Sequence, residues 1–509
     1  MPKQFIFIMT DTQRADMLGC YGNKNMITPS LDKLSEDGIR FTNAYTTQPV
    51  CGPARSALFT GLYPHSNGSW TNCVGLDATV KTVGQRLSHD NVHAAYIGKW
   101  HLDGGDYFGH GKCPDGWDAN YWYDMRNYLN ELSEDERFKS RQVDTIFEGD
   151  GVDASFTYGR RCSDRAIDFI EKHKDEDFFL VVSYDEPHHP FLAPKKYAQM
   201  YKEYNFPVSE NVFDSLENKP EHHKAWAGPR LHEDRSNYII NEAAYFGSNT
   251  FIDDEIGRVL EAYRTNTPDA LIMYTSDHGD HLGSHRLDNK GASMYEEITN
   301  IPFIISGTPV KASNVVNEYP ISHIDVTPSI LDYFNTEKYA MLQGKSLLPL
   351  LRDGDAKINN EIFVEFGRYE IAHDYFGGFQ PIRCIYDGRY KLVVNLLSSD
   401  ELYDLEKDPA EMVNLIEDES HHVLRDKMHD KLLDWMNETR DPFRGYYWER
   451  RPWRKDARIA SWNYTGYCRQ KSPDYDELTE YNYTTAQINP NPVYQLVTPV
   501  NTRENELNK

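Results

Sequence analysis

The sequence predicts an α/β fold in which a large, mixed, mostly parallel sheet is flanked by helices, followed by a smaller α+β subdomain with an antiparallel sheet. Short apolar runs bounded by turn residues recur through the first part of the chain, with helical patterns between them. Buried parallel strands joined by crossover helices have this pattern. Later apolar runs are joined by tight turns, which is typical of antiparallel strands.

Four apolar runs of the first part each end in polar residues. The runs are residues 5–9, 93–97, 178–182 and 270–274. The polar residues that follow them are, in chain order, Asp11, Lys99, His101, His188, Asp277 and His278. Ligands of open α/β sheets bind outside the carboxyl ends of the strands, so we expect these residues to converge on one crevice.

Further elements lie between and after these runs. Residues 29–38 and 82–87 have helical spacing, and residues 301–305 form another buried apolar run. Beyond that run, Thr327 and Pro328 predict the cap and the first turn of another helix.

The second part of the chain predicts a small antiparallel sheet with one packed helix. The expected elements are strands at residues 363–366, 381–386 and 390–395 and a helix at residues 423–436. From about residue 440 the chain is rich in Arg, Trp, Tyr and Pro without periodicity. We therefore expect a main domain at 1–355, the antiparallel-sheet subdomain at 356–440, and an irregular aromatic-rich tail packed on the body at 441–509.

The charge balance restricts the class of partner. The chain has 509 residues with 54 Lys and Arg against 79 Asp and Glu, a net charge of −25. This excess of acid argues against a nucleic acid or an anionic membrane as the main partner. A small anionic ligand would need a local cationic pocket, for which Arg55, Lys99 and Lys290 are the candidates.

The cysteines and the first residues of the chain indicate a cellular location. Seven cysteines, an odd number with no Cys-x-x-Cys spacing, give neither a disulfide framework nor a structural zinc site, so we expect them to be reduced. The chain enters an apolar run at once without a signal-peptide core, and no stretch approaches the length of a membrane span. We therefore expect a soluble cytoplasmic protein.

The most informative motif is Cys51-x-Pro53-x-Arg55, followed by Thr60 and Gly61. It resembles the site at which sulfatases have one cysteine oxidised to formylglycine, an aldehyde whose hydrate attacks a sulfate ester. A thiol attacking sulfur would leave a thiosulfate with no easy exit. A hydrated aldehyde keeps a second hydroxyl that can expel the sulfate, which explains why an oxidised cysteine suits this covalent chemistry.

The resemblance to the sulfatase family extends over most of the chain. Similar blocks occur in family order at residues 10–22, 97–101, 187–191, 275–279 and 401–415. They imply that the first domain has the alkaline phosphatase-like fold.

The same resemblance implies a metal site. Its ligands would be Asp11, Asp277, His278 and formylglycine at residue 51, with Thr12 where many sulfatases have a second Asp. Carboxylate oxygens suit a hard divalent cation that can polarise a sulfuryl or phosphoryl oxygen. Ca²⁺ is the expected ion, with Mg²⁺, Mn²⁺ and Zn²⁺ left open because one carboxylate is missing.

The resemblance also implies roles around the nucleophile. Arg55 would hold the formylglycine, and Lys99 and Lys290 would hold the sulfate oxygens. His101 would orient or deprotonate the hydrated aldehyde, and His188 would support or protonate the leaving-group oxygen. Positive charge placed around a tetrahedral anion stabilises the charge that develops in the transition state.

Two further departures from the family pattern are present, and the first of them bears on the activity. Many sulfatases have Asn where His278 stands, and an Asp-His pair also resembles bacterial phosphonate monoester hydrolases and phosphodiesterases. The segment before Gly98 has Asn91 and Ala94 where the second family signature has Gly and Ser or Thr.

Polar residues elsewhere are candidates for contacts with the substrate. They are Asn72, Asp103, Arg368, His373 and Arg383, the last three flanking or lying in a Gly- and aromatic-rich stretch. Their number favours a hydroxyl-rich leaving group such as a sugar.

Together these observations predict a metal-dependent sulfuric ester hydrolase that acts on a small sulfated carbohydrate. Its expected partners are this anionic substrate and a formylglycine-generating enzyme. Two alternatives remain open: a phosphonate monoester hydrolase or phosphodiesterase of the same superfamily, and a non-catalytic relative that binds an anion through unmodified Cys51.

Overall fold

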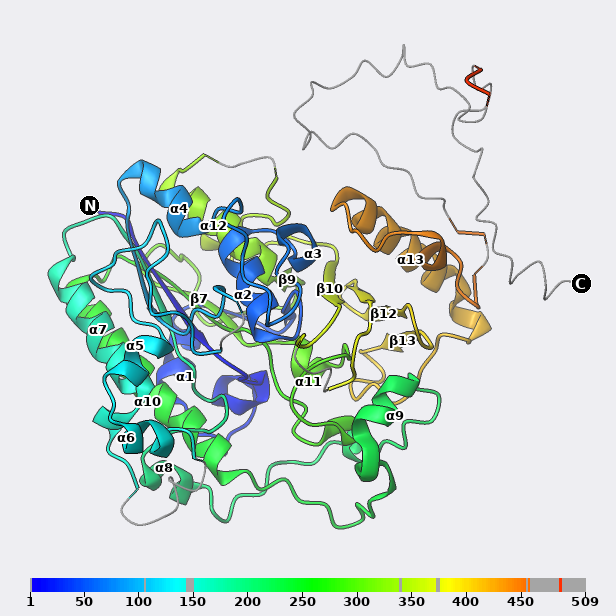
Figure 1. The fold of residues 1–509 in the computed structure, drawn as a ribbon, viewed down its shortest axis with the longest axis horizontal. Helices are drawn as coiled ribbons and strands as arrows, with labels where there is room; N and C mark the ends of the chain where they lie inside the picture. Colours follow the sequence, from blue (N-terminus) through cyan, green and yellow to red (C-terminus); the bar gives the residue numbers. More distant parts are fainter. Residues whose placement is uncertain are drawn as a thin grey trace, which may run out of the picture. The chain divides into compact units, whose positions relative to one another are not determined.

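The structure is a computed structural model that describes residues 2–104, 107–142, 151–337, 341–371, 376–454, 456–457 and 485–487. It divides into two compact units, Met1–Trp462 and Asn463–Lys509. Every element described below belongs to the first unit (Figure 1). The division of the chain at 355 and 440 stays a prediction.

The main sheet has seven strands in the order β4-β5-β1-β6-β7-β2-β8. Their bounds are β1 Gln4–Thr10, β2 Ile39–Phe41, β4 His93–Gly98, β5 Phe178–Ser183, β6 Leu271–Ser276, β7 Phe303–Ser306 and β8 Val315–Asn317. Strands β4, β5, β1 and β6 are parallel neighbours, whereas β7 is antiparallel to both β6 and β2. The sheet is therefore mixed and mostly parallel, as predicted.

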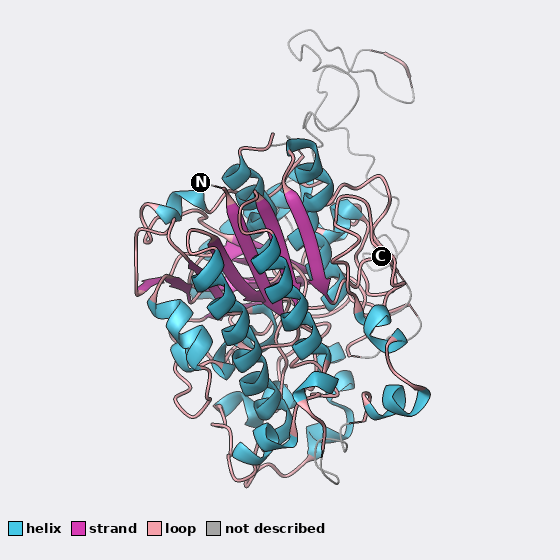
Figure 2. Cartoon of the chain, turned by 90° about the vertical axis from the view of Figure 1, so that its left-hand side faces the viewer, coloured by secondary structure: helices cyan, strands magenta, loops and turns pink. Residues whose placement is uncertain are grey.

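Both faces of this sheet are buried against helices. Along β1, Phe5, Phe7 and Met9 face one core, and Ile6 and Ile8 face the other, because successive side chains of a strand point to opposite sides. In Figure 2 the strands lie behind a layer of helices.

The helices divide between the two cores. The first core contains residues of α2 Cys51–Thr60, α4 Val83–Leu87 and α12 Val326–Phe334. The second contains residues of α1 Pro29–Glu36, α5 Met125–Asn130, α7 Tyr158–Lys172 and α10 Ala243–Asn266. Apart from α13, described below, the remaining α-helices of the described residues are α3 Pro64–Asn67, α6 Glu134–Lys139, α8 Lys195–Met200, α9 Glu221–Ala227, α11 Glu296–Thr299 and α14 Tyr446–Glu449.

The second sheet is antiparallel, with the order β10-β11-β12-β13. Its strands are β10 Ile362–Phe366, β11 Ile382–Tyr386, β12 Tyr390–Asn395 and β13 Glu401–Asp404. Helix α13 His422–Glu438 packs on it through Leu432, Leu433 and Met436. The predicted strands and helix are confirmed, and β13 was not predicted.

Three details differ from the sequence prediction. The two-stranded sheet of β3 Ala44–Tyr45 and β9 Ile321–Ser322 was not foreseen. The predicted cap Thr327 is wrong, because its hydroxyl donates to the Leu58 carbonyl at 2.6 Å. Ser322 and Asp325 form a capping box around the short turn before α12 instead.

Two expectations about composition can be compared with the described residues. No helix there is both long enough and apolar enough to cross a membrane. The six cysteines within that part of the chain are free thiols.

Candidate active site

The carboxyl ends of β1 and β6 bring the two key aspartates together. The strands pair in parallel with Thr10 opposite Ser276, and Asp11 and Asp277 are the next residues of each. Helix α2 presents Cys51 at its first position, and Lys99 follows β4. The structure thus brings together residues from four separate segments, as the strand ends predicted.

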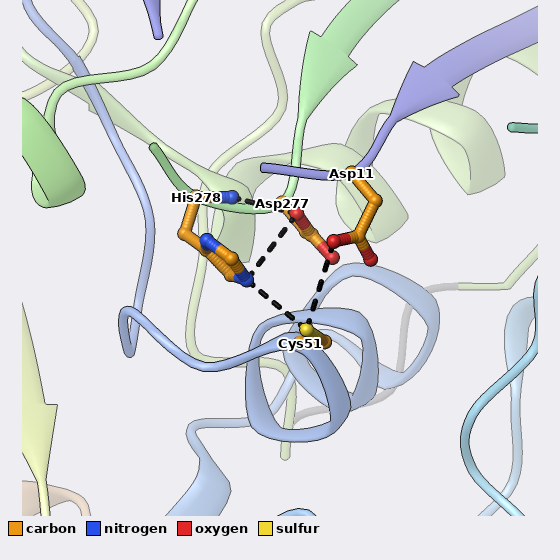
Figure 3. A group of neighbouring side chains, drawn as sticks. All are labelled: Asp11, Cys51, Asp277 and His278. Carbon is orange, nitrogen blue, oxygen red and sulfur yellow. Dashed lines mark hydrogen bonds and ion pairs between the residues drawn. The ribbon is translucent and has the colours of Figure 1, made fainter. Parts of the chain in front are cut away.

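Four buried side chains form a compact group at this point (Figure 3). Candidate ligand atoms of Asp11, Cys51, Asp277 and His278 all lie within 4.8 Å of one another. The Cys51 Sγ lies 3.1 Å from His278 Nε2 and 3.7 Å from Asp11 Oδ1. A single cation placed among these atoms would reach all four residues.

The chemistry of the donors also suits a metal ion. The His278 Nδ1–H donates to the Gly279 carbonyl at 2.8 Å, which leaves the Nε2 lone pair directed into the group. Burial, with Lys290 nearby, lowers the pKa of His278 to about 3, so the imidazole is neutral and able to bind a metal. Burial and the charge of Asp11 raise the pKa of Asp277 to about 8, and a cation between the two carboxylates would remove this repulsion.

Thr12 contacts two of these residues. Its Oγ1 donates to Asp11 Oδ1 at 2.7 Å, and its backbone N–H donates to Asp277 Oδ1 at 3.1 Å. Its φ of 63° turns the chain sharply after β1 so that both donors reach the carboxylates.

Arg55 connects the two strand ends. Its guanidinium donates to Asp11 Oδ2 at 3.0 Å and to Asp277 Oδ2 at 3.1 Å, and its Nη1 donates to the Lys99 carbonyl at 2.7 Å. The side chain is fully buried. Arg55 therefore fixes the spacing of the two aspartates.

Lys99 adds a second buried positive charge. Its Nζ lies 2.8 Å from Asp11 Oδ2 and 3.0 Å from Asp185 Oδ1. Burial alone would lower its pKa, but Asp11, Tyr107 and Asp185 outweigh burial and raise the pKa well above its usual value. Lys99 is therefore charged at neutral pH.

His188 links Lys290 to this network. The Lys290 Nζ donates to His188 Nε2 at 3.1 Å, and the His188 Nδ1–H donates to the His189 carbonyl at 2.7 Å. Burial, followed by the charges of Lys290 and Lys99, lowers the pKa of His188 well below its usual value. The imidazole is therefore neutral, with its N–H on a carbonyl and its lone pair on Lys290, so the donor that this pair can offer to a leaving-group oxygen is the Lys290 ammonium.

His101 is also neutral. Burial and the charge of Lys99 lower its pKa well below the usual value. Its Nδ1 is buried and makes no hydrogen bond with any described residue. A neutral ring with an unused nitrogen can accept a proton, as the predicted role of His101 requires.

The thiol of Cys51 is not activated. Burial, followed by the charge of Asp11, raises its pKa to about 12, so it is protonated at neutral pH. Catalytic cysteines have lowered pKa values instead. The structure therefore provides no thiolate nucleophile at this position.

A cavity of about 500 Å³ adjoins these side chains. Thr12, His188 and Lys290 line it, together with aromatic and acidic residues of other segments. Its volume is that of a small-molecule site.

The remaining residues that were predicted to contact substrate differ in their positions and contacts. Asn72 lies at the site, where its Oδ1 accepts from the Gly52 N–H at 2.9 Å and fixes the first turn of α2. Asp103 accepts from the His110 N–H at 2.8 Å, and Arg368 is half-buried. His373 lies outside the described residues.

Arg383 is a correction. It is 1% exposed, and its Nη2 donates to Asp441 Oδ1 at 2.9 Å while its Nη1 donates to the Phe366 carbonyl at 3.1 Å. These bonds hold the segment after α13 to β11, so the prediction that Arg383 binds substrate is wrong.

Tyr107 was missed by the sequence prediction. Its ring lies 4.1 Å from the Lys99 Nζ, and its hydroxyl donates to Asp185. An isolated tyrosine in a loop gives no periodic or motif signal that could have identified it.

Comparison with known proteins agrees with this geometry. The family model described as Sulfatase matches residues 3–336, and the model described as N-sulphoglucosamine sulphohydrolase, C-terminal, matches residues 283–438. The uncharacterized sulfatase YidJ of Escherichia coli (strain K12) is 46% identical over 464 residues, covering 89% of this chain and 91% of that protein. The arylsulfatase of Clostridium perfringens is 28% identical, covering 83% of this chain and 92% of that protein.

Solved structures show the same fold. A protein in complex with its substrate D-glucosamine-2-N,6-O-disulfate matches with a TM-score of 0.72 at 20% identity, covering 87% of this chain and 99% of that one. The phosphonate monoester hydrolase of Agrobacterium radiobacter matches with a TM-score of 0.71 at 22% identity, covering 86% and 96%. The alkaline phosphatase-like fold is confirmed.

Proposed function

The chain belongs to the sulfatase family and is a sulfuric ester hydrolase, and from this premise we propose that it uses formylglycine formed from Cys51 and one divalent cation to cleave a small sulfated carbohydrate. The observation that carries the proposal is the buried group of Asp11, Cys51, Asp277 and His278 beside a cavity lined by Lys290. The raised pKa of the Cys51 thiol supports an oxidised residue over a thiolate at this position.

The proposed cation would be held by Asp11, Asp277, His278 and residue 51. Ca²⁺ suits the carboxylates, although the histidine nitrogen also suits Mn²⁺ or Zn²⁺. When present, formylglycine supplies the nucleophile and the cation polarises a sulfuryl oxygen.

The chain's own residues orient the ester and move protons. Lys99 and Lys290 carry full charges close to the site, so they can bind sulfate oxygens and stabilise charge that develops on them. His101 accepts a proton at its unused ring nitrogen. His188 lines the cavity and positions the Lys290 ammonium through Nε2, and that ammonium can support the leaving-group oxygen.

The location and the partner remain parts of the proposal. Free thiols at all six described cysteines support action in the reducing cytoplasm. A formylglycine-generating enzyme is the required partner.

A phosphonate monoester hydrolase is the second candidate function. The Asp277-His278 pair and the likeness in fold to the Agrobacterium radiobacter enzyme favour it. Comparison of kcat/KM for 4-nitrophenyl sulfate and 4-nitrophenyl phenylphosphonate separates the two, because the true class should be preferred by a large factor.

The test begins with the mass of the proteolytic peptide that contains Cys51, from protein produced together with a formylglycine-generating enzyme. We expect the mass of the aldehyde and hydrolysis of 4-nitrophenyl sulfate. Cys51→Ala should lower kcat by at least about 1,000-fold, since removal of an activated nucleophile has effects of this order.

The control is the folded state of the variant. Cys51→Ala removes one buried sulfur and should retain the circular dichroism spectrum of the wild type. An intact thiol in active protein, or high activity in the alanine variant, would refute the formylglycine mechanism.

A further inference from the structure

The lining of the cavity beside the site includes one buried cation and three carboxylates. Lys290 lines it and is only 3% exposed. Glu242, an exposed residue directly before α10, lines it as well, together with half-buried Asp280 and Asp288. The lining of this cavity therefore carries charges of both signs.

Among the residues that the structure describes, two of the three carboxylates lack a compensating cation. Asp288 pairs with Arg230 at 2.5 Å. Within the described residues, neither Glu242 nor Asp280 forms an ion pair, and Asp280 Oδ1 accepts only the Leu282 N–H at 2.8 Å. The nearby Arg235 is held by Glu233 at 3.3 Å and by the Gly283 carbonyl at 2.7 Å.

The three carboxylates also act on one another. Burial, followed by the charges of Asp280 and Asp288, raises the pKa of Glu242. Like charges that line one cavity repel each other, which raises the free energy of the folded protein. A cation bound between them would relieve this repulsion.

Aromatic rings form the walls of the same cavity. Phe191 contacts Tyr245 with ring centres 5.6 Å apart, and Tyr369 contacts Phe376 at 4.9 Å. Aromatic faces beside carboxylates recognise ammonium groups through cation–π attraction. Neutral sugars also stack on aromatic rings, but they do not require uncompensated negative charge.

We propose that the leaving group of the substrate carries a free ammonium, as in the sulfate ester of an amino sugar whose amine is not acylated. The sulfate binds at Lys290 and Lys99, and the ammonium lies toward Glu242 and Asp280. This inference rests on the proposed sulfatase function and adds the charge of the leaving group. A second sulfate on the sugar would instead bring an anion to the carboxylates.

The experiment compares D-glucosamine 6-sulfate with D-glucose 6-sulfate, which differ only in an ammonium or a hydroxyl at one carbon. Hydrolysis of 4-nitrophenyl sulfate is measured first, so that failure of the sulfatase function is recognised separately. We expect kcat/KM for the amino sugar to exceed that for the neutral sugar by about fivefold or more, the size of one ion pair at a partly exposed site. A sugar that is not hydrolysed is measured as a competitive inhibitor, and the same ratio is expected between the inhibition constants.

Variants assign the preference to the carboxylates. Glu242→Gln and Asp280→Asn, alone and combined, should lower the ratio of kcat/KM for the amino sugar to that for the neutral sugar toward one. The kcat/KM for glucose 6-sulfate, or its inhibition constant, should stay within about twofold of the wild-type value. Glu203→Gln is the matched control, because Glu203 is exposed and does not line the cavity. High salt should weaken the preference in the wild type.

The inference is overturned if an enzyme that hydrolyses 4-nitrophenyl sulfate has equal kcat/KM, or equal inhibition constants, for the two sugars, or if it prefers the neutral one. A preference that survives in the double variant would also overturn it, because the ammonium would then be recognised elsewhere.

Discussion

Lys290 lies where the candidate site meets the cavity. Its ammonium contacts His188 Nε2, and its charge lowers the pKa of both His188 and His278. Burial is the main cause of the lowered pKa of both imidazoles, and the Lys290 charge adds to it. The same side chain also offers a donor to an anion.

Lys290→Met tests this position. The variant keeps the length of the side chain and removes the charge, so kcat/KM for 4-nitrophenyl sulfate should fall by about 100-fold, as for the loss of one preorganised donor. Thermal unfolding should change little. The exposed Lys202→Met is the control, and wild-type activity in Lys290→Met would exclude a role in sulfate binding.

The sequence predicted site residues where a local pattern marks them. Asp11, Lys99 and Asp277 could be found because each follows a buried run whose end is visible in the sequence. Arg383 was misassigned because its partner Asp441 lies 58 residues further on, and no spacing rule reveals such a pair. Tyr107 reaches Lys99 from a loop, so only the tertiary structure identifies it.

At the scale of elements, α10 caps α1. Asp253 of α10 accepts from the Ser30 and Leu31 N–H groups, each at 2.9 Å. Thr28, at the cap position of α1, makes no capping bond with its own side chain. A residue from a distant helix therefore satisfies the first turn.

Asp253→Ala should destabilise the protein by about 1–2 kcal/mol, the cost of losing a cap. The measurement is the midpoint of thermal unfolding, with Asp253→Asn as the comparison because it retains an acceptor. Equal unfolding temperatures of wild type and Asp253→Ala would contradict the prediction and show that water replaces the carboxylate without loss of stability.

Glu186 links the end of β5 to the start of α7. Its Oε1 accepts from the Gly159 N–H at 3.0 Å, and its Oε2 is buried without a hydrogen-bond partner among the described residues. Burial, followed by the charge of Asp185, raises the pKa of Glu186 to about 8. The folded protein therefore keeps a proton that the unfolded chain loses above its ordinary pKa of 4.5.

This difference makes stability fall as pH rises from about 4.5 to 8, because the unfolded state releases the proton first. Glu186→Gln lacks this contribution, so its unfolding temperature should rise relative to that of the wild type as the pH increases across that range. Asp253 and Asp325 also have raised pKa values, but both residues are present in the wild type and in Glu186→Gln, so their contributions cancel in the comparison. Parallel curves of unfolding temperature against pH would contradict the prediction.

Short and reversed strands limited the prediction of elements. Strands β2 and β8 have three residues each, too few for a periodic pattern, and they are defined by their neighbours in the sheet. The run at 301–305 identified β7, but nothing in an apolar run reveals that the strand is antiparallel.

At the scale of the whole molecule, the buried group of Asp11, Cys51, Asp277 and His278 connects β1, α2 and β6. Without a cation, burial and the nearby charge of Asp11 raise the pKa of Asp277 there. Binding of an ion to the folded state alone must therefore stabilise the fold as well as support activity.

Removal of the metal with EDTA should abolish hydrolysis of 4-nitrophenyl sulfate and lower the unfolding temperature by about 5 °C, with Ca²⁺ restoring both. Asp277→Ala should lose the thermal response to Ca²⁺. An enzyme that keeps its activity after exhaustive chelation would exclude a metal-dependent reaction.

The burial of Cys51 determines the order of events during synthesis. The side chain is 1% exposed at the start of a helix whose ten residues are all buried. An oxidising enzyme cannot reach its sulfur once α2 has packed against the main sheet. The aldehyde of the proposed mechanism would therefore have to be installed on the nascent or unfolded chain, and by that mechanism protein that folds first with a thiol would stay inactive.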